Sequence, residues 1–406
     1  MEGMTIWILA LLLMALLALA GWRQGAIRAA FSFVGIIVGA FLAPLAGKIF
    51  HPLLPHFGAT NPLLIWMLAP ILGFILINIL FAVAAHKVHA NVETFYKYKA
   101  GDLRLSLWER INTRLGICLG ILNGVAYTVL ISFFIFNMAY LTVQVSVGEQ
   151  QSVFTRLINQ AGRDLESTGF NRVAAAVGTL PPAYYKVSDV AGLIMQNPPA
   201  AVRFAKYPGL VSFWEQEALL PLITDPVLTN APASGLPLTE AMATQSVRDF
   251  LQNKELTQQI IDTVVNNYDD LTGFIMTGTS AKYSSEKLVG EWDFNPAVTM
   301  GWLRQDRPKI SAAEMRAIRA MLTQAYAQTH ILVAGDNKIF IKNLPKFKAD
   351  GSSDPTTWKG DWSRSDSGYD LHVLYNSEEK FMSAKAEDLR LTIKDGKTQL
   401  IFDRVD

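Results

Sequence analysis

The sequence predicts a membrane all-α domain of about four transmembrane helices, followed by a soluble α-helical region and a C-terminal antiparallel β-rich (α+β) domain. The first sign is four stretches without Asp, Glu, Lys or Arg, at residues 3–22, 29–47, 49–86 and 115–148. Each is long enough for a spanning helix, which needs about 20 apolar residues. The second sign is a change near residue 286 from helical spacing of apolar residues to the alternation typical of strands. We therefore expect domains at residues 1–145, 146–285 and 286–406.

Positive charge gives the predicted bundle a direction. Eight Lys and Arg residues lie in the two loops at residues 23–28 and 87–114, whereas the intervening loop on the opposite face holds only Lys48. Cytoplasmic loops carry the excess of Lys and Arg, so both charged loops are predicted to be cytoplasmic. Both termini then lie outside, and the soluble part lies in the periplasm or its equivalent. Cleavage of the first stretch as a signal peptide would reverse this arrangement, so we expect it to remain as a helix.

Small residues recur at every fourth position in the apolar stretches. The second stretch has Gly35, Gly39, Ala43 and Gly47, and the fourth has Gly116, Gly120 and Gly124. Residues four apart share a helix face, and side chains this small let two backbones approach closely in lipid. The pattern favours tight helix packing or a homo-oligomer seam, although glycine is also common in membrane helices in general.

Two segments carry a family resemblance. Residues 21–28 read Gly-Trp-Arg-Gln-Gly-Ala-Ile-Arg, and residues 110–124 lead into the last apolar stretch with glycine at every fourth position. Their order and spacing resemble the colicin V production protein (CvpA) family over roughly residues 4–145. The positions assigned to helix packing and to the family motif are Gly21, Gly25, Arg28, Gly35, Gly39, Gly116, Gly120 and Gly124. The chain departs from the family pattern at Gln24, where many members have glycine, and at Asn123, where many have a basic residue.

The resemblance implies a bacterial inner-membrane protein linked to toxin production or export and to envelope homeostasis. It implies no catalytic residue and no cofactor. The expected partners are the lipid bilayer and either a second copy of the chain or other membrane proteins. Nucleic acid is not expected, because residues 1–145 and the remainder carry net charges of only +5 and −4.

The sequence contains no recognisable catalytic or metal-binding motif. His-Glu-x-x-His, Gly-x-Ser-x-Gly, a phosphate-binding loop and a dinucleotide fingerprint are all absent. His86 and His89 are three residues apart, and we interpret them as histidines at the membrane interface rather than as metal ligands. Cys118 is the one cysteine, so no disulfide can form within the chain. We predict a protein that is not an enzyme and binds no metal.

The soluble part has several local signals. Asp395-Gly396 and Gly335-Asp-Asn337 each stand between alternating apolar runs and predict β-hairpins. Ser311-Ala-Ala-Glu314 is a capping box, so one helix is expected among the strands. The aromatic-rich segment 204–214 fits a core turn better than a loop that dips into lipid. Together the strands predict a small curved sheet or partial barrel.

Three functions fit these patterns. The favoured one is a membrane scaffold or export-associated protein with a periplasmic interaction domain. A channel or transporter built by oligomerised Gly-rich helices is the first alternative, and its pathway would include Asn78, Asn123, Ser132 and Asn137. The same four residues could instead make hydrogen bonds between helices. The second alternative is a membrane-tethered lipid- or ligand-binding domain that uses the C-terminal sheet.

Overall fold

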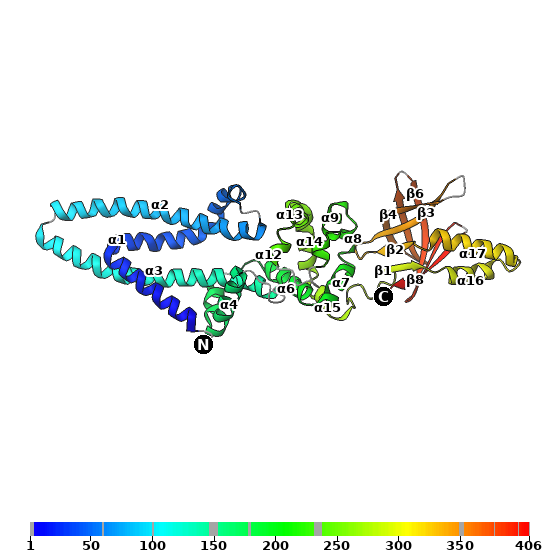
Figure 1. The fold of residues 1–406 in the computed structure, drawn as a ribbon, viewed down its shortest axis with the longest axis horizontal. Coiled ribbons are helices and arrows are strands. Elements are labelled where there is room, and N and C mark those ends of the chain that lie inside the picture. Colours follow the sequence, from blue (N-terminus) through cyan, green and yellow to red (C-terminus); the bar gives the residue numbers. More distant parts are fainter. Residues whose placement is uncertain are drawn as a thin grey trace. The chain divides into compact units, whose positions relative to one another are not determined.

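A computed structural model describes residues 4–58, 61–99, 101–145, 153–177, 180–230, 238–348, 353–376, 378–396 and 398–405. The chain forms two compact units (Figure 1). The first comprises Met1–Gln196 and Asp225–Asn253, and the second comprises Asn197–Thr224 and Lys254–Asp406. The fold class is as predicted, with long apolar helices first, then shorter helices, then antiparallel strands.

The first unit is helical. Its elements are α1 (Met4–Phe50), η1 (Leu54–Phe57), α2 (Pro62–Lys99), α3 (Asp102–Gln144), α4 (Val153–Thr168), α5 (Phe170–Val177), α6 (Pro182–Gln196), α10 (Pro226–Thr229), α12 (Leu238–Ala241) and α13 (Gln245–Gln252). Many large apolar side chains of α1, α2 and α3 are exposed on the outside of the bundle, such as Phe41 and Leu45. An outward apolar surface of this kind is suited to lipid.

In the described residues, three helices are long and apolar enough to cross a membrane, where the sequence predicted about four. These are Ile6–Phe50, Leu64–Lys99 and Asp102–Gln144. The difference lies in α1, which joins the first two predicted stretches. Inside α1, Gly25 has φ 79° and ψ 169°, which is not helical and is a conformation essentially confined to glycine. The ribbon of α1 changes direction sharply between its two halves (Figure 1), so each predicted stretch remains a helical segment of its own.

The second unit combines short helices with a barrel. Its helices are α7 (Pro198–Lys206), α8 (Val211–Trp214), η2 (Glu217–Leu219), α9 (Leu220–Ile223), α14 (Lys254–Asn266), α15 (Tyr268–Thr277), α16 (Pro296–Asp306) and α17 (Ala312–Tyr326). Its strands are β1 (Gly290–Phe294), β2 (His330–Val333), β3 (Lys338–Phe347), β4 (Ser353–Ser365), β5 (Gly368–Tyr375), β6 (Glu378–Ala386), β7 (Arg390–Asp395) and β8 (Thr398–Val405).

The strands form a closed antiparallel barrel in sequence order, and β1 pairs with β8 to complete it. Both predicted hairpins are present: Gly335-Asp-Asn337 connects β2 to β3, and Asp395 pairs with Thr398 across the turn from β7 to β8. Lys397 of that second turn lies outside the described residues.

Two helices, α16 and α17, separate β1 from β2, where one was expected. The capping box at Ser311 and Glu314 starts α17, and the unforeseen α16 starts where the side chain of Asn295 accepts a hydrogen bond from the Val298 amide at 3.0 Å.

Large side chains fill the interior of the barrel. They form one cluster with residues from all eight strands, and Trp292, Ile331, Ile339 and Val373 are fully buried in it. The indole nitrogen of Trp292 donates to the Leu288 carbonyl oxygen at 2.9 Å, so this buried donor is satisfied. An eight-stranded barrel is either filled by side chains or able to hold one small ligand. Because large side chains of all eight strands are buried together here, the barrel core is a packed interior.

The aromatic segment 204–214 is a core turn, as favoured from the sequence. Tyr207 and Leu210 are fully buried, and the Tyr207 hydroxyl donates to the carboxylate of Asp270 at 2.8 Å. Burial alone would raise the pKa of Asp270, but hydrogen bonds from Ser280, from the Lys282 amide and from Tyr207 outweigh it and hold that pKa below its usual range. Burial, together with this hydrogen bond, raises the pKa of Tyr207. The pair therefore stays a neutral phenol on a charged carboxylate, which fixes the turn on α15.

The packed barrel predicts a strong dependence on Trp292. Replacing Trp292 with alanine is expected to lower the free energy of unfolding of the barrel by about 3–5 kcal/mol, because it leaves a cavity in a dense core. Denaturant unfolding of the detergent-solubilised chain, followed by protease digestion of the unfolded barrel, measures the change. Phe381→Ala is the matched control, since Phe381 is 73% exposed on β6 and its loss should cost less than about 0.5 kcal/mol. Equal losses in the two variants would contradict a side-chain-filled interior.

Candidate functional site: the break in α1 and its contacts with α2 and α3

The break in α1 is closed by a side chain of α3. The Ala26 amide, which begins the second helical segment, donates to the side-chain oxygen of Asn112 at 2.8 Å. The first amides of a helix have no partner within it, so Asn112 satisfies one that would otherwise be unpaired. A Cβ at Gly25 would overlap this amide group, with Cγ of Asn112 only 2.8 Å away. Gly25 is therefore required both by its φ and by the space that Asn112 occupies.

The first half of α1 packs backbone against backbone with α3. A Cβ added at Gly21 would overlap the carbonyl oxygen of Gly116, and one at Gly116 would overlap that of Gly21. Gly120 meets the carbonyl of Leu17 in the same way, and a Cβ at Gly124 would lie 2.6 Å from Cα of Met14. The structure thus brings four of the sequence-predicted positions, Gly21, Gly116, Gly120 and Gly124, into one helix–helix contact.

The second half of α1 packs against α2. A Cβ at Gly35 would lie 2.9 Å from Cβ of Phe81, and one at Gly39 would lie 2.9 Å from the side-chain nitrogen of Asn78. The same contact continues to Gly47, opposite the backbone of Ala69. The glycines of the second apolar stretch therefore face α2, whereas those of the fourth stretch, which lie on α3, face the first half of α1. Their assigned packing role stays a prediction, and these contacts are the geometry on which it rests.

Arg28, the last residue of the family motif, follows the break by three residues and interacts electrostatically with His89 of α2. It is half-buried, and within the described residues its Nε has no hydrogen-bond partner. His89 of α2 is 8% exposed, and its Nε2 lies 3.7 Å from the carboxylate of Glu93. The His89 ring lies 6.1 Å from that of Trp108 of α3. His89 is thus buried between helices, whereas His86 is exposed, and the position of both at the membrane interface stays a prediction.

These side chains can bind or orient charge. Over the described part of the chain, no group of three or more His, Cys, Asp or Glu side chains is placed to hold a metal ion. Arg28 presents a guanidinium, which donates hydrogen bonds and accepts none. Arg28 is the charged residue of the motif, and it lies at the break, in the first charged loop.

Three of the four polar residues that could line a channel donate a hydrogen bond to a helix backbone. Asn123 donates to the Ala29 carbonyl oxygen of α1 at 3.1 Å. Asn78 and Asn137 donate to carbonyl oxygens one turn earlier in their own helices, Phe74 and Phe133, at 2.9 and 2.8 Å. Only the hydrogen bond of Asn123 joins two helices, α3 and α1, and it favours helix packing over a lined pathway for that residue.

The fold and the site define a multi-pass membrane protein with a glycine-packed helix bundle and a soluble β-barrel. Residues 7–163 match the family model described as Colicin V production protein, which confirms the predicted resemblance for the N-terminal region. The match covers fewer than half of the residues and extends into α4. In α4, Asn159 accepts a hydrogen bond from Thr142 of α3 at 2.7 Å, so this helix packs on the bundle. No curated protein and no solved structure gives a significant match.

The break in α1 predicts different outcomes for two glycines in the same backbone conformation. Gly25→Ala should destabilise the detergent-solubilised protein more than Gly101→Ala, as measured by thermal unfolding. Both residues have φ near 80° and extended ψ, so alanine costs about 1–3 kcal/mol of strain at either position. Only Gly25 adds an overlap, because nothing lies within 4 Å of a Cβ at Gly101. Equal destabilisation would show that Asn112 does not hold the break.

Proposed function

We propose that this chain is a non-enzymatic scaffold of the bacterial inner membrane. Its bundle anchors the protein, and its barrel is a periplasmic domain that binds another envelope protein. By its likeness to the colicin V production family, the complex acts in toxin production or export and in envelope homeostasis. The family match over residues 7–163 supports the anchoring role of the bundle.

The filled barrel interior is the observation that carries the proposal. A ligand-binding barrel of this size would leave room for one small molecule, whereas here Trp292, Trp358 and Trp362 help to occupy the centre. A partner would therefore bind to the outer surface of the barrel. One open cleft of about 620 Å³ lies over β4, β5 and β6, where Phe381 stacks on His372 with ring centroids 4.5 Å apart. Exposed aromatic side chains of this kind are typical anchors of protein interfaces.

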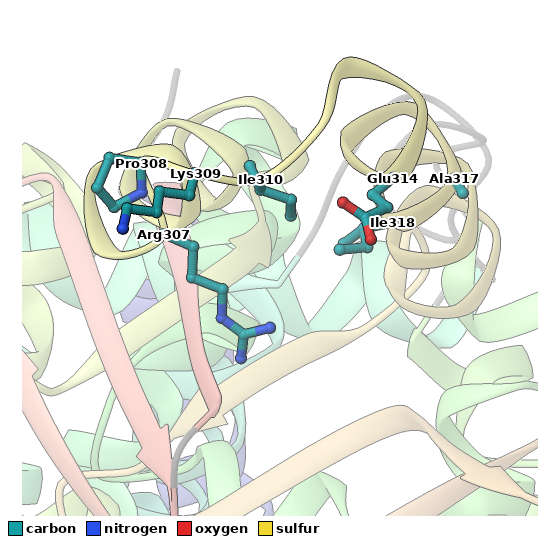
Figure 2. A pocket seen from close by; sticks show the side chains of 7 residues that line it. All are labelled: Arg307, Pro308, Lys309, Ile310, Glu314, Ala317 and Ile318. Atoms are coloured by element: carbon teal, nitrogen blue, oxygen red, sulfur yellow. The ribbon is translucent and has the colours of Figure 1, made fainter.

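A second open cleft of about 620 Å³ lies at the helical hairpin of the barrel. Figure 2 shows that its lining comes from the loop that follows α16 and from the start of α17. Arg307 and Lys309 bring positive charge to it, and Ile310 and Ile318 bring apolar surface. Both clefts are open to the outside, which supports an interaction domain more than a lipid-carrying one.

A measurement of ion flux distinguishes the channel hypothesis from the scaffold hypothesis. Liposomes containing the purified chain are expected to show no conductance above that of empty liposomes under a potassium, sodium or proton gradient. Liposomes with a known channel, reconstituted in parallel, are the positive control. Flux that depends on the protein would overturn the scaffold proposal in favour of the channel.

The periplasmic placement is tested by two alkaline phosphatase fusions, since this enzyme is active only outside the cytoplasm. A fusion after residue 145 is expected to be active, because α3 ends on the side opposite the charged loops. A fusion after Lys99 is expected to be inactive, because it retains Lys87, Lys97 and Lys99 of the charged loop that is predicted to be cytoplasmic. Immunoblots confirm that both fusions accumulate equally. The reverse pattern of activity would place the barrel in the cytoplasm.

A further inference from the structure

The α2–α3 hairpin is much longer than a bilayer requires. At about 1.5 Å per residue, α2 and α3 measure about 57 and 65 Å, whereas the hydrocarbon core is about 30 Å thick. Charged residues occupy the end of α2 from Lys87 and the start of α3 up to Arg114. We call residues 87–99 and 102–114 the helical tip. Tyr96 stacks on Trp108 inside it, with ring centroids 5.3 Å apart, which joins the two helices.

The outer side of the tip is apolar and uncovered. Leu103, Leu107 and Ile111 of α3 are 76%, 50% and 55% exposed. They follow one another at every fourth position, so they form one stripe along the helix. Phe95 and Tyr98 of α2 are exposed as well. A water-facing helix normally turns polar residues outward, so this stripe needs an apolar neighbour.

The basic residues at the start of α3 lie on the same side of the helix as the stripe, and the acidic residues lie on the opposite side. At about 100° per residue, Arg104, Arg110 and Arg114 fall on the same side of α3 as Leu107. Asp102 and Glu109 fall on the opposite side. An exposed face of apolar side chains interleaved with arginine is typical of helices that lie in the headgroup layer of a membrane, since the arginines reach anionic headgroups while the apolar groups enter the acyl region.

We propose that the helical tip lies in the headgroup layer of an anionic membrane leaflet, with Leu103, Leu107 and Ile111 toward the acyl chains. The stripe is continuous with the lipid-facing surface of the spanning part of α3, where Leu115, Cys118 and Leu122 are exposed. The same helix face thus passes from the hydrocarbon core into the tip without interruption. Because the stripe continues the lipid-facing surface and carries three arginines, we infer that lipid covers it. The inference is independent of the barrel and of its partner.

The single native cysteine makes the proposal testable in the full chain. Cys118 labelled with an environment-sensitive thiol dye provides the lipid-facing reference. In a Cys118→Ser background, Leu107→Cys places the dye on the stripe, and Glu109→Cys places it on the opposite side at nearly the same height. Each protein is reconstituted into phosphatidylcholine vesicles with and without phosphatidylglycerol. A lipid carrying bromine on its acyl chain serves as a contact quencher.

The expected result is a blue-shifted emission at position 107, close to that of Cys118, and a red-shifted emission at position 109. The brominated lipid should quench the dye at 107 but not at 109, and phosphatidylglycerol should increase that quenching. Substituting Arg104→Gln and Arg110→Gln together should remove the effect of phosphatidylglycerol. Leu103→Cys repeats the measurement one turn away if the protein with Leu107→Cys fails to reconstitute.

Three results would overturn the proposal. Emission at 107 as red as at 109 places the tip in water. Blue-shifted emission that the brominated lipid does not quench means that a second copy or another protein covers the stripe. Equal quenching with and without phosphatidylglycerol removes the preference for an anionic leaflet.

Discussion

The close contact between the first half of α1 and α3 is the constraint on which the rest of the bundle depends. At Gly21 and Gly116 each helix occupies the position where the other would carry a Cβ. Water supplies no driving force between helices in lipid, so close packing and hydrogen bonds must hold them together. The same approach brings Asn112 within reach of the Ala26 amide and Asn123 within reach of the Ala29 carbonyl oxygen. Glycine packing thus makes possible the polar contacts that hold the break in α1.

In the barrel, the constraint on which the structure depends is closure of the sheet. Pairing of β1 with β8 leaves no open edge, so the backbone hydrogen-bonding groups at that seam are used within the domain. The helices between β1 and β2 contribute Met300 and Leu322 to the core cluster. A closed barrel offers partners its side chains rather than a strand edge. This is why the exposed Phe381 and the clefts on the outer surface matter more for the proposed function than the interior does.

The sequence predicted what short-range patterns specify and missed what depends on distant residues. Gly335-Asp-Asn337 and the capping box at Ser311 are local, so the hairpin and α17 could be predicted. Closure joins Trp292 to Arg404, more than a hundred residues away, and no local pattern encodes it. At the site, the glycine spacing indicated close packing but not which helix each glycine faces. The environment of Arg28 depends on His89 from α2, and that could not be read from the motif alone.

The break at Gly25 also bears on the direction of the chain. The hydrogen bond from Ala26 to Asn112 places the first charged loop and the helical tip at the same end of the bundle. Met14 lies against Gly124 and Gly21 against Gly116, so the first half of α1 runs antiparallel to α3 and leads away from that end. The start of α1 therefore lies toward the end of α3, and Trp7 of α1 contacts Phe170 of α5 there, with ring centroids 4.7 Å apart. The helix contacts alone therefore place the eight basic residues at one end of the bundle. By the positive-inside rule, that end is expected to face the cytoplasm.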